Sequence, residues 1–539
     1  MLPILALSAV LVSGPQADLV ITGAIIYTAD PVRPRASALA VKDGKVLAVG
    51  EDVEAYLGPR TRKLDVKGAT VIPGFIDSHA HMQGLGDSRQ VLELRNTTSP
   101  EQVAEMVRRA AREHKPGEWI RGRSWDQSLY PSKEFPSGDV LTAAAPANPV
   151  YLTRVDGHAS WVNAKALEMA GISATTKDPP GGKILRAAKG APTGILVDTA
   201  QGLVSRKIPP LGAEQVKSRL ERAAQECARF GITTVHDAGC GREELDGYRA
   251  LIAAGKLSIR IYAMIGGEGG LWREYLQRGP EVGDRLVVRS IKLFADGAMG
   301  SRGALLYKPY SDDPGNTGLA MISEQDIARI AKEAAAHGFQ VNTHAIGDKA
   351  NRMTIDAYAA ALAPGNDRRF RVEHAQVVTP EDVQLFHKYG VVAAMQATHA
   401  TTDMRWAEAR LGPQRVKGAY AWRWFLSEGV HLSNGSDFPV EEVNPLLGFY
   451  AAVTRQDANG KPDGGWFPDQ TMTREEALKS WTVEGAYAAF EEKTKGSLTP
   501  GKVADFVVLS RDIMRVPAKE ILSTRVRMTV VGGEIVYSE

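Results

Sequence analysis

Between about residues 69 and 494, the hydrophobic pattern switches repeatedly from the period of a strand to the period of a helix. The clearest unit is a strand at 339–343, a helix at 350–362 and a second strand at 370–372. Strands that alternate with helical crossovers pair in parallel. The pattern therefore predicts an α/β fold built on a parallel sheet.

Some of the predicted helices carry recognisable ends. Thr379 and Pro380 followed by two acidic residues are typical of a helix N-terminus, and Gly390 is typical of the end of that helix. Thr473 and Glu476 have the spacing of a capping box, which predicts a further helix over 477–490.

The two ends of the chain have short alternating strands instead. Asp43-Gly44 between two such runs predicts a hairpin, and Gly532-Gly533 predicts a turn near the C-terminus. The expected strands are 19–22, 24–27, 38–42, 45–49, 505–509 and 527–537.

The segment at about 99–224 does not follow the strand-helix alternation. It mixes helical patterns with stretches rich in Pro and Gly, such as 178–182. We interpret it as an insertion that carries a lid or substrate loops.

Charge and composition exclude several classes of protein. The chain has 65 basic and 63 acidic residues, a formal net charge of +2, so we expect no nucleic-acid partner. Its 44% hydrophobic residues are enough for a globular core. The two cysteines, Cys227 and Cys240, indicate neither a disulfide framework nor a thiolate metal site.

The first residues resemble a signal peptide. Residues 1–14 form an apolar run that is too short to cross a bilayer, so we expect no stable membrane insertion of the mature protein. Small residues end the run, which favours a cleaved segment over residues 1–17 and export to the periplasm or the medium. The run lacks Lys or Arg at its start, and a cytoplasmic protein is the alternative.

The strongest local motif is the run Gly74 to His81, which contains His79 and His81 two residues apart. Residues two apart on a strand lie on one side, so the two imidazoles can bind one ion. Imidazole suits zinc and several other divalent ions, and the pair alone is equally compatible with a structural role.

Other residues of metal-ligand type end later strand-like runs. They are Lys292, His344, His374 and Asp437. The carboxyl ends of the strands of a (β/α)8 barrel meet at one face, where its active site forms. The order and spacing of these residues therefore favour a (β/α)8 TIM barrel.

These motifs resemble the amidohydrolase superfamily, and within it the amidohydrolase-3 or YtcJ-like branch, which includes N-substituted formamide deformylases. The stretches that carry the resemblance are 74–81, 125–126, 156–158, 292–297, 344–348, 372–376, 435–439 and 501–506. The resemblance implies a metal-dependent hydrolase barrel over 69–494. It also implies a small composite β-sandwich formed from both termini, residues 18–68 and 495–539.

The resemblance also implies the roles of the ligands. His79 and His81 would bind a more buried ion, and His344 and His374 a more exposed one. Lys292 would bridge the two ions as a carbamate, because a lysine ammonium cannot ligate. The alternative is an unmodified Lys292 beside one ion or paired with Asp296. Asp437 would be a metal ligand and the general base. We expect zinc, with manganese, iron and cobalt as alternatives.

Five further residues are candidates for contact with the substrate, although each is equally compatible with a structural role. They are Trp125, Asp126, Tyr130, His158 and His236. His399 is a similar candidate on the strand before that of Asp437.

We expect the protein to hydrolyse an amide or related non-peptide C–N bond in a small molecule, because the branch that it resembles includes such enzymes. The same barrel acting on a lactone, an ester or a phosphoester is the alternative. A non-enzymatic scaffold would lack some ligands, whereas this chain retains all six. The oligomeric state stays open, with a homodimer as one option.

Overall fold

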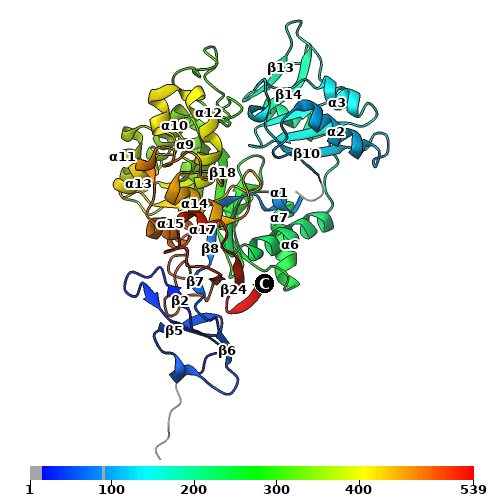
Figure 1. Ribbon diagram of the computed structural model, residues 1–539. Coiled ribbons are helices and arrows are strands. Elements are labelled where there is room, and N and C mark those ends of the chain that lie inside the picture. Colours follow the sequence, from blue (N-terminus) through cyan, green and yellow to red (C-terminus); the bar gives the residue numbers. More distant parts are fainter. Residues whose placement is uncertain (1–14, 88–90) are drawn as a thin grey trace, which may run out of the picture.

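The computed structural model describes residues 15–87 and 91–539 and has three parts: a central barrel, a lobe beside it and a small β-domain below it (Figure 1). The predicted signal peptide, residues 1–17, falls mostly on residues outside the described chain.

The central part is a nearly closed barrel of eight parallel strands, which confirms the predicted (β/α)8 fold. The strands are, in barrel order, β8 (Phe75–Ala80), β15 (Ile232–Cys240), β16 (Arg260–Gly266), β18 (Leu286–Phe294), β19 (Gln340–Ala345), β20 (Arg371–His374), β21 (Val392–Met395) and β22 (Leu432–Asn434). Just beyond β22, Asp437 N–H donates to His79 O at 2.7 Å and His81 N–H donates to Phe438 O at 2.8 Å. These two bonds join the first and last strands at the carboxyl end of the barrel.

Helices surround the strands. They are α6 (Ala213–Arg229), α7 (Arg242–Ala253), α8 (Leu271–Arg278), α9 (Glu324–Ala336), α10 (Asp348–Ala359), α11 (Pro380–Tyr389), α12 (Ala397–Arg415), α13 (Trp422–Ser427), α14 (Pro445–Thr454), α15 (Arg474–Ser480) and α16 (Val483–Ala488). Thr379 caps α11, and Gly390 ends it in the left-handed region, as predicted. The prediction of a single helix over 477–490 is wrong, because this segment contains two short helices, α15 and α16. They are separated at Thr482, whose φ and ψ of −136° and −90° are not helical.

The two ends of the chain form one small domain, as predicted. Its first sheet contains β1 (Leu19–Thr22), β4 (Ala38–Lys42), β5 (Lys45–Gly50) and β6 (Arg62–Asp65). Its second sheet joins β2 (Ile25–Tyr27), β3 (Arg35–Ala36) and β7 (Thr70–Pro73) to β23 (Phe506–Leu509), β24 (Val526–Val531) and β25 (Glu534–Ser538). Side chains such as Ile21, Val71 and Phe506 pack in one core.

The lobe beside the barrel is a six-stranded sheet with helices, whereas the sequence analysis interpreted this segment as an insertion that carries a lid or substrate loops. Its strands are β9 (Leu92–Glu93), β10 (Ile120–Trp125), β11 (Val150–Arg154), β12 (Ala159–Val162), β13 (Gly182–Arg186) and β14 (Pro192–Asp198), and its helices include α2 (Pro100–Ala111), α3 (Asp139–Ala144) and α4 (Ala164–Ala170). It has a core of its own around Trp125 and Trp161.

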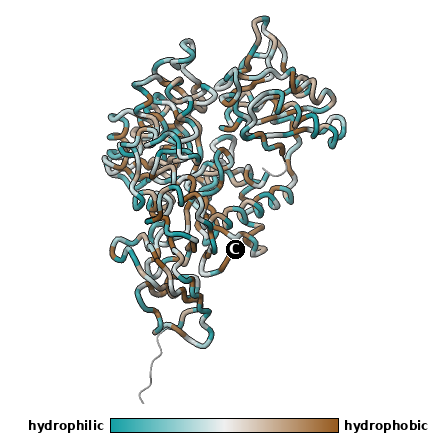
Figure 2. Tube along the Cα trace, in the orientation of Figure 1, coloured by the Kyte–Doolittle hydropathy of each residue, from teal (hydrophilic) through white to brown (hydrophobic). Residues whose placement is uncertain are grey.

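Hydrophilic residues recur along the outer loops of all three parts (Figure 2). Among the described helices, none combines the length and the apolar character needed to cross a membrane.

Candidate metal centre

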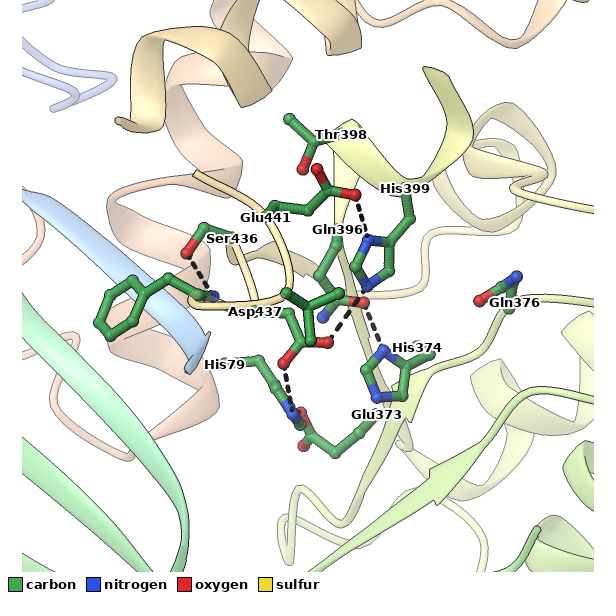
Figure 3. A network of polar contacts seen from close by, with 12 residues as sticks. His79, Glu373, His374, Gln376, Gln396, Thr398, His399, Ser436, Asp437 and Glu441 are labelled. Carbon is green, nitrogen blue, oxygen red and sulfur yellow. Dashed lines mark hydrogen bonds and ion pairs between the residues drawn. The ribbon is translucent and has the colours of Figure 1, made fainter. Parts of the chain in front are cut away.

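The carboxyl ends of the barrel strands bring the predicted ligands together. Ligand atoms of His79, His374 and Asp437 all lie within 4.8 Å of one another, and all three side chains are buried (Figure 3). Asp437 Oδ1 lies 3.7 Å from His79 Nε2 and 3.2 Å from His81 Nε2. The His79 and His81 side chains therefore face one point at the end of β8, as their spacing predicts.

His344 and Lys292 lie beside this group. The His344 ring centroid is 4.7 Å from that of His374, and Lys292 Nζ is 4.5 Å from the centroid of Phe294, which in turn packs on His344. Both residues are almost fully buried. All six ligand-type residues predicted from the sequence thus lie at one face of the barrel.

A second layer of contacts orients three of the imidazoles. Nδ1 of His79 is bonded to Glu373, Nδ1 of His81 faces Ala238 O at 3.0 Å, and Nδ1 of His374 faces Gln396 Oε1 at 2.7 Å. Because Nδ1 is occupied in each ring, Nε2 is the nitrogen left for an ion. Such outer contacts are typical of histidines that bind metal.

The electrostatics keep the ligands in the forms that bind a cation. Burial lowers the pKa of His79 to about 4, and burial also lowers the pKa values of His344 and His374 well below the usual range. Burial alone would raise the pKa of Glu373, but Arg371, His79 and Lys292 together outweigh it and lower that pKa to about 2. Neutral imidazoles beside ionised carboxylates are a ligand set for a divalent ion.

The residues present fit such an ion. His79 Nε2, His344 Nε2 and Lys292 Nζ are buried, and none has a hydrogen-bond partner within the part of the chain that the structure describes. Each unpaired buried group costs about 1–3 kcal/mol. His374 and Asp437 also have positive φ values, 73° and 59°, and strained backbone of this kind is concentrated at functional sites. An ion at this point would satisfy groups that the protein leaves unpaired.

Comparison with known proteins decides the family. The amidohydrolase family matches residues 62–537. This chain belongs to the amidohydrolase family. It is 32% identical to the putative amidohydrolase YtcJ of Bacillus subtilis, over 96% of this chain and 99% of that protein. It is 29% identical to the N-substituted formamide deformylase of Arthrobacter pascens, over 96% and 98%.

A solved structure agrees with these matches. A metal-dependent hydrolase from Pyrococcus horikoshii, 29% identical, aligns over 93% of this chain and 99% of its own, with a TM-score of 0.76. The resemblance to the YtcJ-like branch is thus confirmed, and this amidohydrolase is a metal-dependent hydrolase with a buried His, His and Asp site.

In this amidohydrolase, Asp77 is a site residue that the sequence analysis missed. Its carboxylate accepts hydrogen bonds from Ser436 Oγ at 2.6 Å and Ser436 N–H at 3.0 Å, 359 positions along the chain, and from His79 N–H at 3.2 Å. A Cβ on Gly435 would collide with Asp77 and His79. Asp77 therefore holds the last strand against the first. It stands inside the quoted motif two residues before His79, so strand alternation places it on the same side as that ligand, but no local pattern indicates its contact with Ser436.

His399 contacts the proposed base directly. His399 Nε2 lies 3.2 Å from Asp437 Oδ2, and its Nδ1 lies 3.1 Å from Glu441 Oε1 (Figure 3). Burial would lower the pKa of His399, but Asp437 and Glu441 outweigh it and raise that pKa well above its usual range. Glu441 follows β22 in a loop, where no periodic pattern indicates it.

Two of the predicted substrate contacts line the cavity at the centre. Asp126 and His158 share a cavity of about 170 Å³ with His344, His374 and Asp437. Asp126 is paired with Arg154 and, across to α12, with Arg405, both at 2.9 Å. His158 Nδ1 lies 2.7 Å from Asp198 Oδ1.

The other three candidates lie away from that cavity. Trp125 is in the core of the lobe, where its indole N–H donates to Leu152 O at 2.9 Å. Tyr130 is buried in the same lobe, outside the cavity wall. His236 lies inside the barrel, where its Nδ1 contacts Arg371 Nη1 at 2.9 Å. Trp125 lies on β10, which belongs to the inserted sheet, and His236 points into the barrel core.

Proposed function

We propose that this amidohydrolase cleaves an amide C–N bond in a small non-peptide compound, with N-substituted formamides as the first class to test. The observation that carries the proposal is the buried His, His and Asp group, of which His374 and Asp437 line a cavity of about 170 Å³. Support for the bond comes from the formamide deformylase, a relative that aligns over 96% of the chain. The size of the cavity favours a compact acyl group.

We further propose two divalent ions, zinc first. His79, His81 and Asp437 would hold one ion, and His344 and His374 the other. When bound, such ions polarise a carbonyl oxygen and lower the pKa of a bound water to about 7. The same ligands accept other first-row metals, so the metal itself is a subject of the test.

Lys292 would link the two ions as a carbamate. Its Nζ is buried, and burial lowers its pKa to about 8, so a neutral amine is accessible. The amine nitrogen would form a bond to the carbon of CO₂ and release one proton to solvent. The product is anionic and offers two oxygens, which a lysine ammonium does not.

Asp437 would move the proton. Its carboxylate accepts a proton from the attacking water and delivers it to the departing nitrogen, so that one group serves both steps. His399 keeps Asp437 Oδ2 in place from the side opposite His79 and His81. Glu373, Ala238 and Gln396 keep the three imidazoles in the orientation that faces the reacting group.

The test combines metal content, intact mass and turnover. Protein purified without chelator and with bicarbonate should contain two metal equivalents per chain and an added mass of about 44 Da, one CO₂. The loaded protein should release formate from N-butylformamide. One equivalent without added mass would contradict the bridged site. Turnover of lactones or phosphoesters, with none of amides, would contradict the proposed bond.

A further inference from the structure

The inserted lobe places one imidazole at the metal-centre cavity and holds it rigidly. His158 follows β11, and its side chain is 15% exposed in the wall of the cavity. Its ring centroid is 5.0 Å from that of His344. The barrel supplies the metal ligands, so His158 approaches the same cavity from a separate part of the fold.

Three contacts hold this imidazole in place. Its Nδ1 is 2.7 Å from Asp198 Oδ1, its backbone N–H donates to Asp156 Oδ1 at 3.0 Å, and its carbonyl accepts from Asp198 N–H at 2.9 Å. Because Nδ1 is occupied by Asp198, Nε2 is the ring nitrogen that can meet a bound molecule. A side chain fixed in this way loses little entropy when it binds a ligand.

The position of the Asp198 carboxylate costs folding free energy. The Asp198 side chain is fully buried, its Oδ2 has no hydrogen-bond partner in the described chain, and its backbone has a positive φ of 50°. Strained non-glycine backbone costs about 1–3 kcal/mol and persists where the surroundings enforce it. These costs indicate that the position of Asp198 serves more than packing.

The barrel also leaves room for this carboxylate. Asp198 projects from the end of β14 against the loop that follows β18, where it touches Gly297 and Gly303. A Cβ on either glycine would collide with the carboxylate. The lobe and the barrel therefore fit together around Asp198, directly behind the His158 ring.

We propose that His158 is a catalytic residue contributed by the inserted lobe, which hydrogen-bonds the amide group of the substrate through Nε2, and that Asp198 is its positioning residue. This inference rests on the proposed function for the bond that is cleaved. The inserted lobe would therefore take part in catalysis directly, in addition to its expected role as a lid over the cavity. Removing one such preorganised hydrogen bond lowers kcat by about 100- to 1000-fold.

The kinetic test is a double-mutant cycle with N-butylformamide as the probe. We expect His158→Gln to lower kcat by about 100-fold with two metal equivalents retained. We expect Asp198→Asn to lower kcat in the native background and to have no further effect when combined with His158→Gln. His431→Gln is the matched control, because His431 has the same Nδ1 contact, 2.7 Å to Glu484, on the surface. It should keep kcat within about twofold.

Two results would overturn the assignment. Wild-type kcat in His158→Gln would remove His158 from catalysis. An equal loss from Asp198→Asn in both backgrounds would show that Asp198 acts through the fold and not through His158, since residues that act as a unit are not additive.

A chemical readout separates this inference from the proposed function. Diethyl pyrocarbonate should modify Nε2 of His158, and N-butylformamide should protect it, as measured by peptide mass spectrometry, with His431 modified equally with and without the probe. Failure of His158 to react, or reaction without protection, would overturn its place at the substrate. Protection without formate release would keep His158 as a ligand contact and contradict the proposed reaction.

Discussion

The carboxylate of Glu373 on β20 forms a hydrogen bond with Nδ1 of His79 on β8, which lies 294 positions earlier in the chain. Glu373 is in turn paired with Arg371, whose Nε lies 2.7 Å from Glu373 Oε1. The carboxylate therefore fixes both the orientation and the tautomer of a metal ligand from another strand. The first prediction follows from this contact.

Glu373→Gln should weaken metal binding by about 10- to 100-fold, the usual effect of removing such a supporting carboxylate. Competition with a chromophoric chelator would measure the dissociation constant. Glu484→Gln, which alters the surface partner of His431, is the control and should leave metal affinity unchanged. Native affinity in Glu373→Gln would show that His79 needs no carboxylate to orient it.

His79→Ala should abolish metal-dependent turnover while the barrel stays folded, because the side chain is a ligand and the strand retains its backbone pairing. Formate release and far-UV circular dichroism would measure the two properties. A chelator should inactivate the native enzyme in the same way, and added zinc should restore it. Normal turnover in His79→Ala would refute the metal centre described above.

Asp437→Asn should retain metal and lose turnover, since the amide oxygen can still contact an ion but the group no longer accepts a proton. Metal content per chain and kcat, measured on the same preparation, separate the two roles. A variant that keeps the native rate would show that another group carries the proton.

Asp77→Ala should destabilise the protein by about 3 kcal/mol, because it removes a buried hydrogen-bond acceptor and leaves its donors unpaired, which costs about 1–3 kcal/mol for a buried group. The urea midpoint would report the change. Asp77→Asn keeps part of this contact and should lose less. Equal stability of Asp77→Ala and the native protein would mean that Asp77 does not hold the first and last strands together.

The capping residue Glu476 gives a pH-dependent prediction away from the centre. Its hydrogen bond from Arg423 lowers the pKa of Glu476 from 4.5 to about 2. A lowered folded-state pKa stabilises the protein above the unfolded value of 4.5, and this contribution is lost as the pH falls towards 2. The urea midpoints of the native protein and Glu476→Gln should therefore differ at pH 6 and approach each other progressively as the pH falls from about 5 towards 2. A constant difference would contradict the assignment.

The sequence predicted the ligands because each one lies at or near the carboxyl end of a strand, and the barrel gathers these ends. It did not predict Glu373, because strand alternation places neighbouring residues on opposite sides. At His374 the positive φ breaks that alternation, so both residues reach the centre. Asp77, Asp198 and Glu441 are defined by contacts between distant segments, which no local pattern encodes. The inserted sheet was missed for a similar reason, since β9 is only two residues long and its strands pair across loops.

The composite domain can finish folding only after strands from both ends of the described chain have been synthesised. β7, near the start of the chain, pairs with β23, and β24 and β25 extend the same sheet. A nascent chain therefore carries an unfinished sheet until β23, β24 and β25 have emerged from the ribosome. A product truncated before β23 would expose the edge of β7, and exposed edges of this kind promote aggregation. The sheet that contains β7 is thus complete only after β23, β24 and β25 have been synthesised.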